Sequence, residues 1–150
     1  MVKGLLRAGF AKWEASDLAT LRMLRQLGVE DVTADWTLYA FNMSALRQLA
    51  ELGVRRFVAS PENHPANLRF LAESGFAVEF LSQQSTPLFI SLTEPVRGGA
   101  GSDGVPDAGE IAGLSVFRRD GLWVTTKPVP RTFEVPNGAS TRLDLSWDPA

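Results

Sequence analysis

The sequence predicts an α/β fold in which helices and strands alternate along most of the chain. One short pattern occurs three times, as LRMLRQLGV at 21–29, LRQLAELGV at 46–54 and LRFLAESGF at 68–76. In each copy, leucines three residues apart share one helical face, and a glycine follows where a left-handed residue would end the helix. An extended apolar run follows every copy. Repeated helix–glycine–strand units of this length are typical of a parallel sheet.

Length and composition limit the classes of protein to be considered. The chain has 150 residues, 45% of them hydrophobic, and a formal net charge of −2, which suits one core and a small appendage. The absence of cysteine excludes disulfides, thiolate catalysis and cysteine-bound iron–sulfur clusters. No basic run alternates with aromatic residues, so we expect no nucleic-acid partner. No segment has the apolar length of a signal peptide or a membrane span, so we expect a cytoplasmic location and no membrane partner.

The extended runs give the strands, and the polar residues before the helices give their N-termini. We expect Ser16 or Asp17 to cap the first helix, Asn42 or Ser44 to cap the second, and Pro65 to occupy the first turn of the third. Four parallel strands are then expected at 12–15, 31–39, 55–59 and 77–81, the last resuming at 88–92.

Four βα units form only part of a barrel, because a closed eightfold (β/α) barrel needs about 250 residues. We therefore expect residues 1–95 to form a partial-barrel, TIM-barrel-like domain of consecutive βα units. Either a half-barrel is completed by another chain, or the strands form a small open sheet with helices on one face. In the second case the β appendage or a partner would cover the other face, and self-association would supply that partner.

The composition changes after the fourth unit. Residues 96–113 are rich in Gly, Asp and Pro, and we expect a flexible linker or a disordered loop there. Residues 114–150 are expected to form a small C-terminal β-hairpin appendage. Its two hairpins would turn at Asp120-Gly121 and at Pro136-Asn137-Gly138.

Polar residues near the carboxyl ends of the strands are the candidates for chemistry, because α/β proteins place their sites at that edge. Glu79 lies between two apolar residues of its strand, so it would be either an inward-facing site carboxylate or a solvated edge residue paired with an arginine. Glu62 and His64 could orient a water molecule, but a turn before a helix collects such residues for backbone reasons, and we favour that interpretation. The full set is Glu14, Asp35, Asn42, Ser60, Glu62, Asn63, His64, Glu79, Gln83 and Gln84.

The other repeated or aromatic residues have simpler interpretations. Arg22, Arg47 and Arg69 follow a core leucine in each repeat, which indicates solvated helix faces or ion pairs between helices. The tryptophans are expected to anchor the core or a domain interface. They are Trp13, Trp36, Trp123 and Trp147.

The order of five short segments resembles the C-terminal half of the barrel of peptidase family U-32, the collagenase-like peptidases. The resemblance runs from about residue 9 to residue 95, and more weakly over 118–123. The segments are Tyr39-Ala40-Phe41-Asn42, ELGV at 51–54, Ser60-Pro61-Glu62, Val78-Glu79-Phe80 and Pro87-Leu88.

The resemblance implies a peptidase that acts on a peptide or protein, with Glu79, Glu62 and Asn42 as its site residues. The cysteine cluster of the family is absent here, so its iron–sulfur chemistry is not carried over, and we expect no cofactor and no metal. No self-sufficient catalytic set is visible, so the chain would be a fragment or subunit whose site is completed by missing segments or another chain. The alternative is a non-catalytic binding or assembly module that uses the open sheet face.

Overall fold

The computed structural model describes residues 2–94, 108–111 and 113–147. Its described residues group into two units. Unit 1 comprises Met1–Ser82 and Phe133–Arg142, and unit 2 comprises Gln83–Thr132 and Leu143–Ala150. The chain therefore passes from one unit to the other three times, and neither unit is a single continuous segment.

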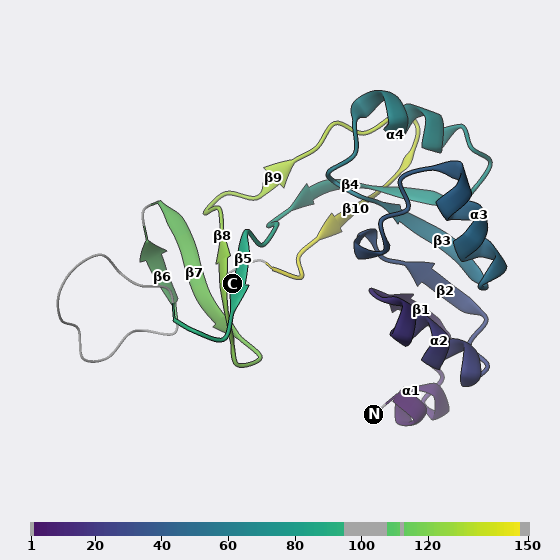
Figure 1. The fold of residues 1–150 in the computed structure, drawn as a ribbon, viewed down its shortest axis with the longest axis horizontal. Coiled ribbons are helices and arrows are strands. Elements are labelled where there is room, and N and C mark those ends of the chain that lie inside the picture. The colour runs from purple at the N-terminus through teal and green to yellow at the C-terminus, as the bar shows by residue number, and fades with distance from the viewer. Residues whose placement is uncertain (1, 95–107, 112, 148–150) are drawn as a thin grey trace. The chain divides into compact units, whose positions relative to one another are not determined.

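Unit 1 is a largely parallel sheet whose strands alternate with helices (Figure 1). The strand order is β1-β2-β3-β4, and each of these neighbouring pairs is parallel. This confirms the predicted α/β class and the succession of βα units. The elements are α1 (Val2–Arg7), β1 (Lys12–Ala15), α2 (Leu18–Gln26), β2 (Asp31–Ala34), the 3-10 helix η1 (Trp36–Leu38), α3 (Met43–Glu51), β3 (Val54–Ala59), α4 (Pro65–Ala72) and β4 (Val78–Gln84).

The threefold repeat forms the ends of the three helices and the core beneath them. In α3, Leu46 and Leu49 are buried, and the helix ends at Glu51, two residues before Gly53. Gly53 has a φ of 93°, and a Cβ at this position would lie 2.6 Å from the Arg25 side chain. The Arg25 side chain is flexible and could move aside, so the positive φ is what favours glycine here, as it does at Gly28 and Gly75, whose φ values are 77° and 80°.

The two faces of the parallel sheet differ in chemistry. One face belongs to the hydrophobic core that the helices also line, and it includes Val32, Phe57 and Phe80. Because side chains alternate along a strand, the residues between them point to the opposite face. On that face Glu14 is paired in register with Thr33, and Thr33 with Arg56. The second face of the sheet therefore carries a row of polar side chains, beside the buried Val58, which is paired in register with Glu79.

The second strand is shorter than predicted. The strand expected over 31–39 ends at Ala34, and η1 follows. The Asp35 carboxylate accepts a hydrogen bond from the Trp36 backbone N–H, and Tyr39 has a φ of 51°. Because a carboxylate that caps its own backbone competes with the sheet ladder, the aromatic run after Asp35 does not continue as a strand.

The segment around Pro136-Asn137-Gly138 does not form the predicted hairpin. β9 (Arg131–Thr132) pairs antiparallel with β4, and β10 (Ser140–Asp144) also lies next to β4 in the sheet. β4 is longer than its contact with β3, which ends at Ala59 opposite Phe80, so it offers unpaired backbone to both segments. The predicted hairpin is therefore wrong at this turn.

Unit 2 is a four-stranded antiparallel sheet in the order β5-β8-β7-β6. Asp120 and Gly121 join β7 to β8, and the pair opposite each other beside this turn is Arg119 and Leu122. The buried residues of this sheet include Val116, Phe117 and Val124. The strands are β5 (Phe89–Ser91), β6 (Ala108–Ile111), β7 (Leu114–Arg119) and β8 (Leu122–Thr126).

Two predictions need correction in unit 2. The run at 88–92 does not resume β4, because β5 pairs with β8 in the other sheet. Residues 108–111 of the predicted linker form β6, which pairs with β7. The rest of the predicted linker, apart from Gly113, lies outside the described residues.

Candidate functional site

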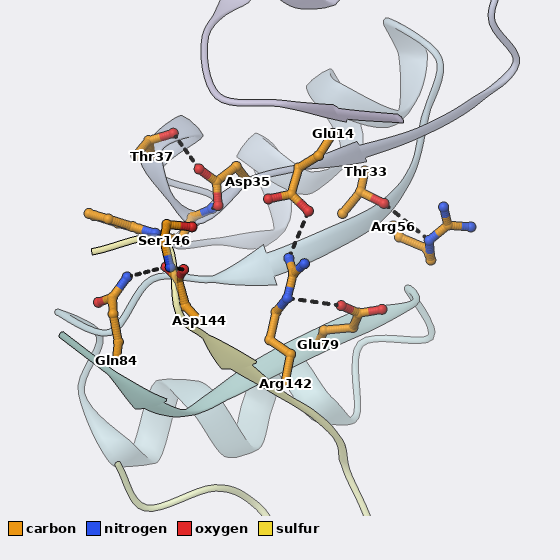
Figure 2. A network of polar contacts seen from close by, with 11 residues as sticks. Glu14, Thr33, Asp35, Thr37, Arg56, Glu79, Gln84, Arg142, Asp144 and Ser146 are labelled. Carbon is orange, nitrogen blue, oxygen red and sulfur yellow. Dashed lines mark hydrogen bonds and ion pairs between the residues drawn. The ribbon is translucent and has the colours of Figure 1, made fainter. Parts of the chain in front are cut away.

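The polar face of unit 1 is concave, because the Arg142 side chain contacts carboxylates on two different strands of the sheet. Its Nη1 lies 2.9 Å from Glu14 Oε2, and its Nε lies 3.6 Å from Glu79 Oε2 (Figure 2). Glu14 is on β1 and Arg142 on β10, the two ends of the strand order β1-β2-β3-β4-β10. Four flat strand spacings would separate the two strands by about 19 Å, farther than a glutamate and an arginine side chain can span together. The sheet must therefore curve strongly toward its polar face.

Strand alternation explains why both glutamates reach this face. Glu79 lies between Val78 and Phe80, which belong to the hydrophobic core on the opposite face. Glu14 likewise lies between Trp13 and Ala15, of which Ala15 is fully buried. Each carboxylate is thus held on a strand whose neighbouring residues are fixed by packing.

A third carboxylate, that of Asp35, lies beside Glu14 at the carboxyl end of β2 (Figure 2). Its Oδ1 accepts a hydrogen bond from the Trp36 N–H at 2.8 Å, and its Oδ2 lies 3.1 Å from Thr37 Oγ1. Thr37 also donates to the Ser16 carbonyl oxygen, which connects η1 to the segment after β1. Below, "the concave face" means Glu14, Asp35, Glu79 and Arg142.

The electrostatics of the concave face single out Glu14. Burial raises the pKa of Glu14 above its ordinary value, and the nearby Asp35 charge raises it further, against the opposing effect of Arg142. Burial works to lower the pKa of Arg142, but the hydrogen bond that Arg142 donates to Glu14 and the negative charges of Glu14, Glu79 and Asp35 raise it overall. Arg142 therefore stays cationic, and Glu14 is a carboxyl group whose ionisation this site disfavours.

A second ion pair lies on the same face of the sheet. Arg56 on β3 places its Nη2 2.6 Å from Asp31 Oδ1 on β2, and its Nε donates to Thr33 Oγ1 at 3.1 Å. Both charged side chains are 28% exposed, so this pair is partly shielded from water. It links two neighbouring strands and leaves Arg56 with its own carboxylate partner.

Two of the three site residues implied by the resemblance lie elsewhere. Asn42 is the N-cap of α3, where its Oδ1 accepts a hydrogen bond from the Ala45 N–H at 2.9 Å. Glu62 is exposed in the turn after β3, and its backbone N–H contacts Ser60 Oγ. Within the described part of the chain, no hydrogen bond or ion pair joins either residue to Glu79.

The remaining candidates hold the loops in place. His64 caps α4 through Nδ1, which accepts from the Ala66 N–H at 3.2 Å. Asn63 Oδ1 accepts from Asn67 Nδ2, and the same amide group of Asn67 reaches the Phe41 carbonyl oxygen. The turn after β3 is thereby fixed to the loop before α3, which is the backbone role expected for such residues.

Gln84, in unit 2, is almost fully buried and makes two side-chain hydrogen bonds. Its Nε2 donates to Asp144 Oδ2 at 2.6 Å, and its Oε1 accepts from Thr86 Oγ1 at 2.7 Å. The polar groups of this glutamine are therefore satisfied by β10 and by the segment after β4.

Arg142 is the residue of the concave face that the sequence pattern does not indicate. It belongs to a segment that the sequence predicts to pair with its own neighbours, far along the chain from Glu14 and Glu79.

Among the residues that the structure describes, no group of three or more His, Asp or Glu side chains could hold a metal ion. No described helix has the length and apolarity needed to cross a membrane.

Comparison with protein-family models, with curated proteins and with solved structures gives no match for this chain.

Proposed function

We propose that the chain is a non-catalytic binding module whose concave face receives a basic group of a peptide or protein partner. The observation that carries this proposal is the position of Arg142 between Glu14 and Glu79. A guanidinium group that contacts both carboxylates occupies the space that a scissile bond would need. Neither glutamate is left as an unobstructed catalytic base.

Charge supports a basic partner. The concave face contains three carboxyl groups and one guanidinium, so it carries a net negative charge when all of them are ionised. A lysine or arginine side chain of the partner would contact the carboxylates together with Arg142. Its positive charge would reduce the electrostatic repulsion between Asp35 and Glu14. Charged residues on rigid strands also give such a site a fixed geometry.

The test uses tetralysine as the probe and tetraglutamate as the charge-reversed control. Amide chemical shifts in β1, β4 and β10 should move saturably with tetralysine only. Glu79→Gln should weaken tetralysine binding several-fold, and the exposed Glu62→Gln should leave it unchanged. Equal binding by wild type and Glu79→Gln, or equal shifts with both peptides, would contradict the proposal. The comparison should be made at low salt, because exposed charges are screened at high ionic strength.

A second candidate is the peptidase function implied by the U-32 resemblance, with the chain as a fragment or subunit of a hydrolase. The raised pKa of Glu14 favours it, because burial and the nearby Asp35 shift this carboxyl group toward the protonated form that a general acid needs. The four consecutive βα units are also compatible with half of a barrel. In this candidate Arg142 must move before Glu79 meets the substrate.

Peptide hydrolysis separates the two candidates. If the protein cleaves a casein digest and Glu79→Gln abolishes the cleavage, the binding module is ruled out as the whole function. If Glu79→Gln cleaves as well as wild type, Glu79 is removed from the catalytic proposal. Glu62→Gln and Asn42→Ala test the other two residues implied by the resemblance, each in the same assay.

We further propose a cytoplasmic location and association with a second copy or a partner chain over the concave face. The absence of cysteine supports the former. Light scattering tests the latter, and a monomer mass at all concentrations with no bound partner would contradict self-association.

A further inference from the structure

We infer that unit 1 has a second binding site, a pocket beside α4 that accepts a small zwitterion with an apolar side chain, such as a free aliphatic amino acid. The pocket has a volume of about 480 Å³, which lies within the range of small-molecule sites. It is separate from the concave face. Its lining residues are Arg69, Ala72, Glu73, Val78, Phe80, Pro136, Asn137, Gly138, Ala139 and Ser140.

The topology of the sheet explains why a pocket forms here. The crossovers from β1 to β2, β2 to β3 and β3 to β4 each contain a helix, namely α2, α3 and α4. β10 lies beside β4 without such a helix, and the chain reaches it through the segment 133–139 (Figure 1). The pocket is lined by residues of α4, of β4 and of 136–140, so it lies where this segment, rather than a further helix, follows α4.

The floor of the pocket is apolar and firmly placed. Val78 and Phe80 are 8% and 2% exposed, and both belong to the hydrophobic core. Ala139, at the far wall, packs partly against the same core. Because Val78 and Phe80 are almost fully covered, an aliphatic side chain of the ligand would contact chiefly the more accessible apolar lining residues above them, Ala72, Pro136 and Ala139.

The rim carries one positive and one negative charge on adjacent turns of the same helix. Arg69 and Glu73 are four residues apart at the end of α4, and the Glu73 N–H donates to the Arg69 carbonyl oxygen. Neither side chain forms an ion pair with any residue that the structure describes, whereas Arg55, Arg56 and Arg142 all do. The two charged groups are therefore available to a ligand.

This pairing of charges defines the ligand class. A guanidinium group binds a carboxylate through two parallel hydrogen bonds, and a carboxylate accepts hydrogen bonds from an ammonium group. Arg69 would thus bind the α-carboxylate of an amino acid and Glu73 its α-ammonium group. Asn137 and Ser140, which also line the pocket, offer neutral hydrogen-bonding groups. A second hollow of about 190 Å³ shares Arg69, Pro136 and Asn137 and extends the space along α4.

The test compares three probes that share a branched carbon skeleton. L-Leucine carries both charges, 4-methylpentanoate lacks the ammonium group, and 3-methylbutylamine lacks the carboxylate. We expect leucine to shift the amide resonances of Val78, Phe80 and Ala139 saturably, and the other two probes to bind roughly tenfold more weakly. No saturable shift with leucine, or equal binding of all three probes, would overturn the inference.

Variants assign the effect to the pocket. Arg69→Gln and Glu73→Gln should each weaken leucine binding roughly tenfold, because each removes one charge-assisted contact. Arg47→Gln is the matched control, since Arg47 is the exposed arginine at the same position of the preceding repeat and does not line the pocket. Ala72→Phe should block binding while both charges remain. Unchanged binding in Arg69→Gln would refute the site.

One further variant separates this inference from the proposed function. Glu79→Gln should bind leucine as wild type does, because Glu79 does not line the pocket. A loss of leucine binding in that variant would place the ligand on the concave face and overturn the pocket.

Discussion

At the scale of single residues, the protein depends on contacts between positions far apart in the sequence. Strand alternation predicts that Glu79 faces away from Val78 and Phe80, and the structure places it so. The partner could not be predicted, because Arg142 reaches Glu79 only through the unexpected position of β10 next to β4. A sequence specifies which face a side chain occupies more directly than it specifies the strand that will lie opposite.

The raised pKa of Glu14 predicts a pH dependence of stability. Between its ordinary value of 4.5 and its higher folded-state value, the folded protein binds more protons than the unfolded chain. The free energy of unfolding should therefore fall as pH rises through this window. Glu14→Gln mimics the protonated form and lacks this loss, so the variant should gain stability relative to wild type as pH rises from 4.5.

Urea unfolding of both proteins between pH 4 and pH 8 measures this difference. Glu62→Gln is the control, since Glu62 is exposed and lies outside the concave face. A Glu14→Gln profile parallel to that of wild type over the whole range would show that Glu14 is not perturbed in the folded protein.

At the scale of elements, local signals were sufficient where one element follows the next. Capping residues, the glycine after each helix and the period of the leucines predict β1, α2, α3, β3 and α4 to within a few residues. The same signals do not report which strand an edge segment will join. The sequence therefore predicts that the segments of β9 and β10 pair with each other, whereas in the structure each lies beside β4.

The N-terminus of α3 allows a direct test of a cap that the sequence left open between Asn42 and Ser44. Asn42 Oδ1 accepts the Ala45 N–H, so Asn42→Ala should lower the free energy of unfolding by about 1 kcal/mol. Ser44→Ala should change it by a few tenths of that, because Ser44 is already inside the helix. Urea unfolding of both variants decides between them, and equal losses would contradict the assignment of the cap.

At the scale of the whole molecule, the units are not the continuous ranges that composition suggests. Phe133–Arg142 belongs to unit 1, although a whole antiparallel sheet separates it in sequence from β4. Composition changes along a chain mark changes in local character. They carry no information about a later segment that returns to an earlier sheet. Composition therefore predicts residues 114–150 as one continuous appendage, although part of this range belongs to unit 1.

Separate buried cores in the two units lead to the last prediction. Leu46 is fully buried in the core cluster of unit 1, and Val124 is fully buried in unit 2 and is not part of that cluster. Leu46→Ala should cost about 2 to 5 kcal/mol, and Val124→Ala should cost less because fewer carbon atoms are removed. Native-state hydrogen exchange should show the first loss in β2 and β3 and the second in β7 and β8. Equal loss of protection in both sheets for both variants would mean that the two cores unfold as one cooperative body.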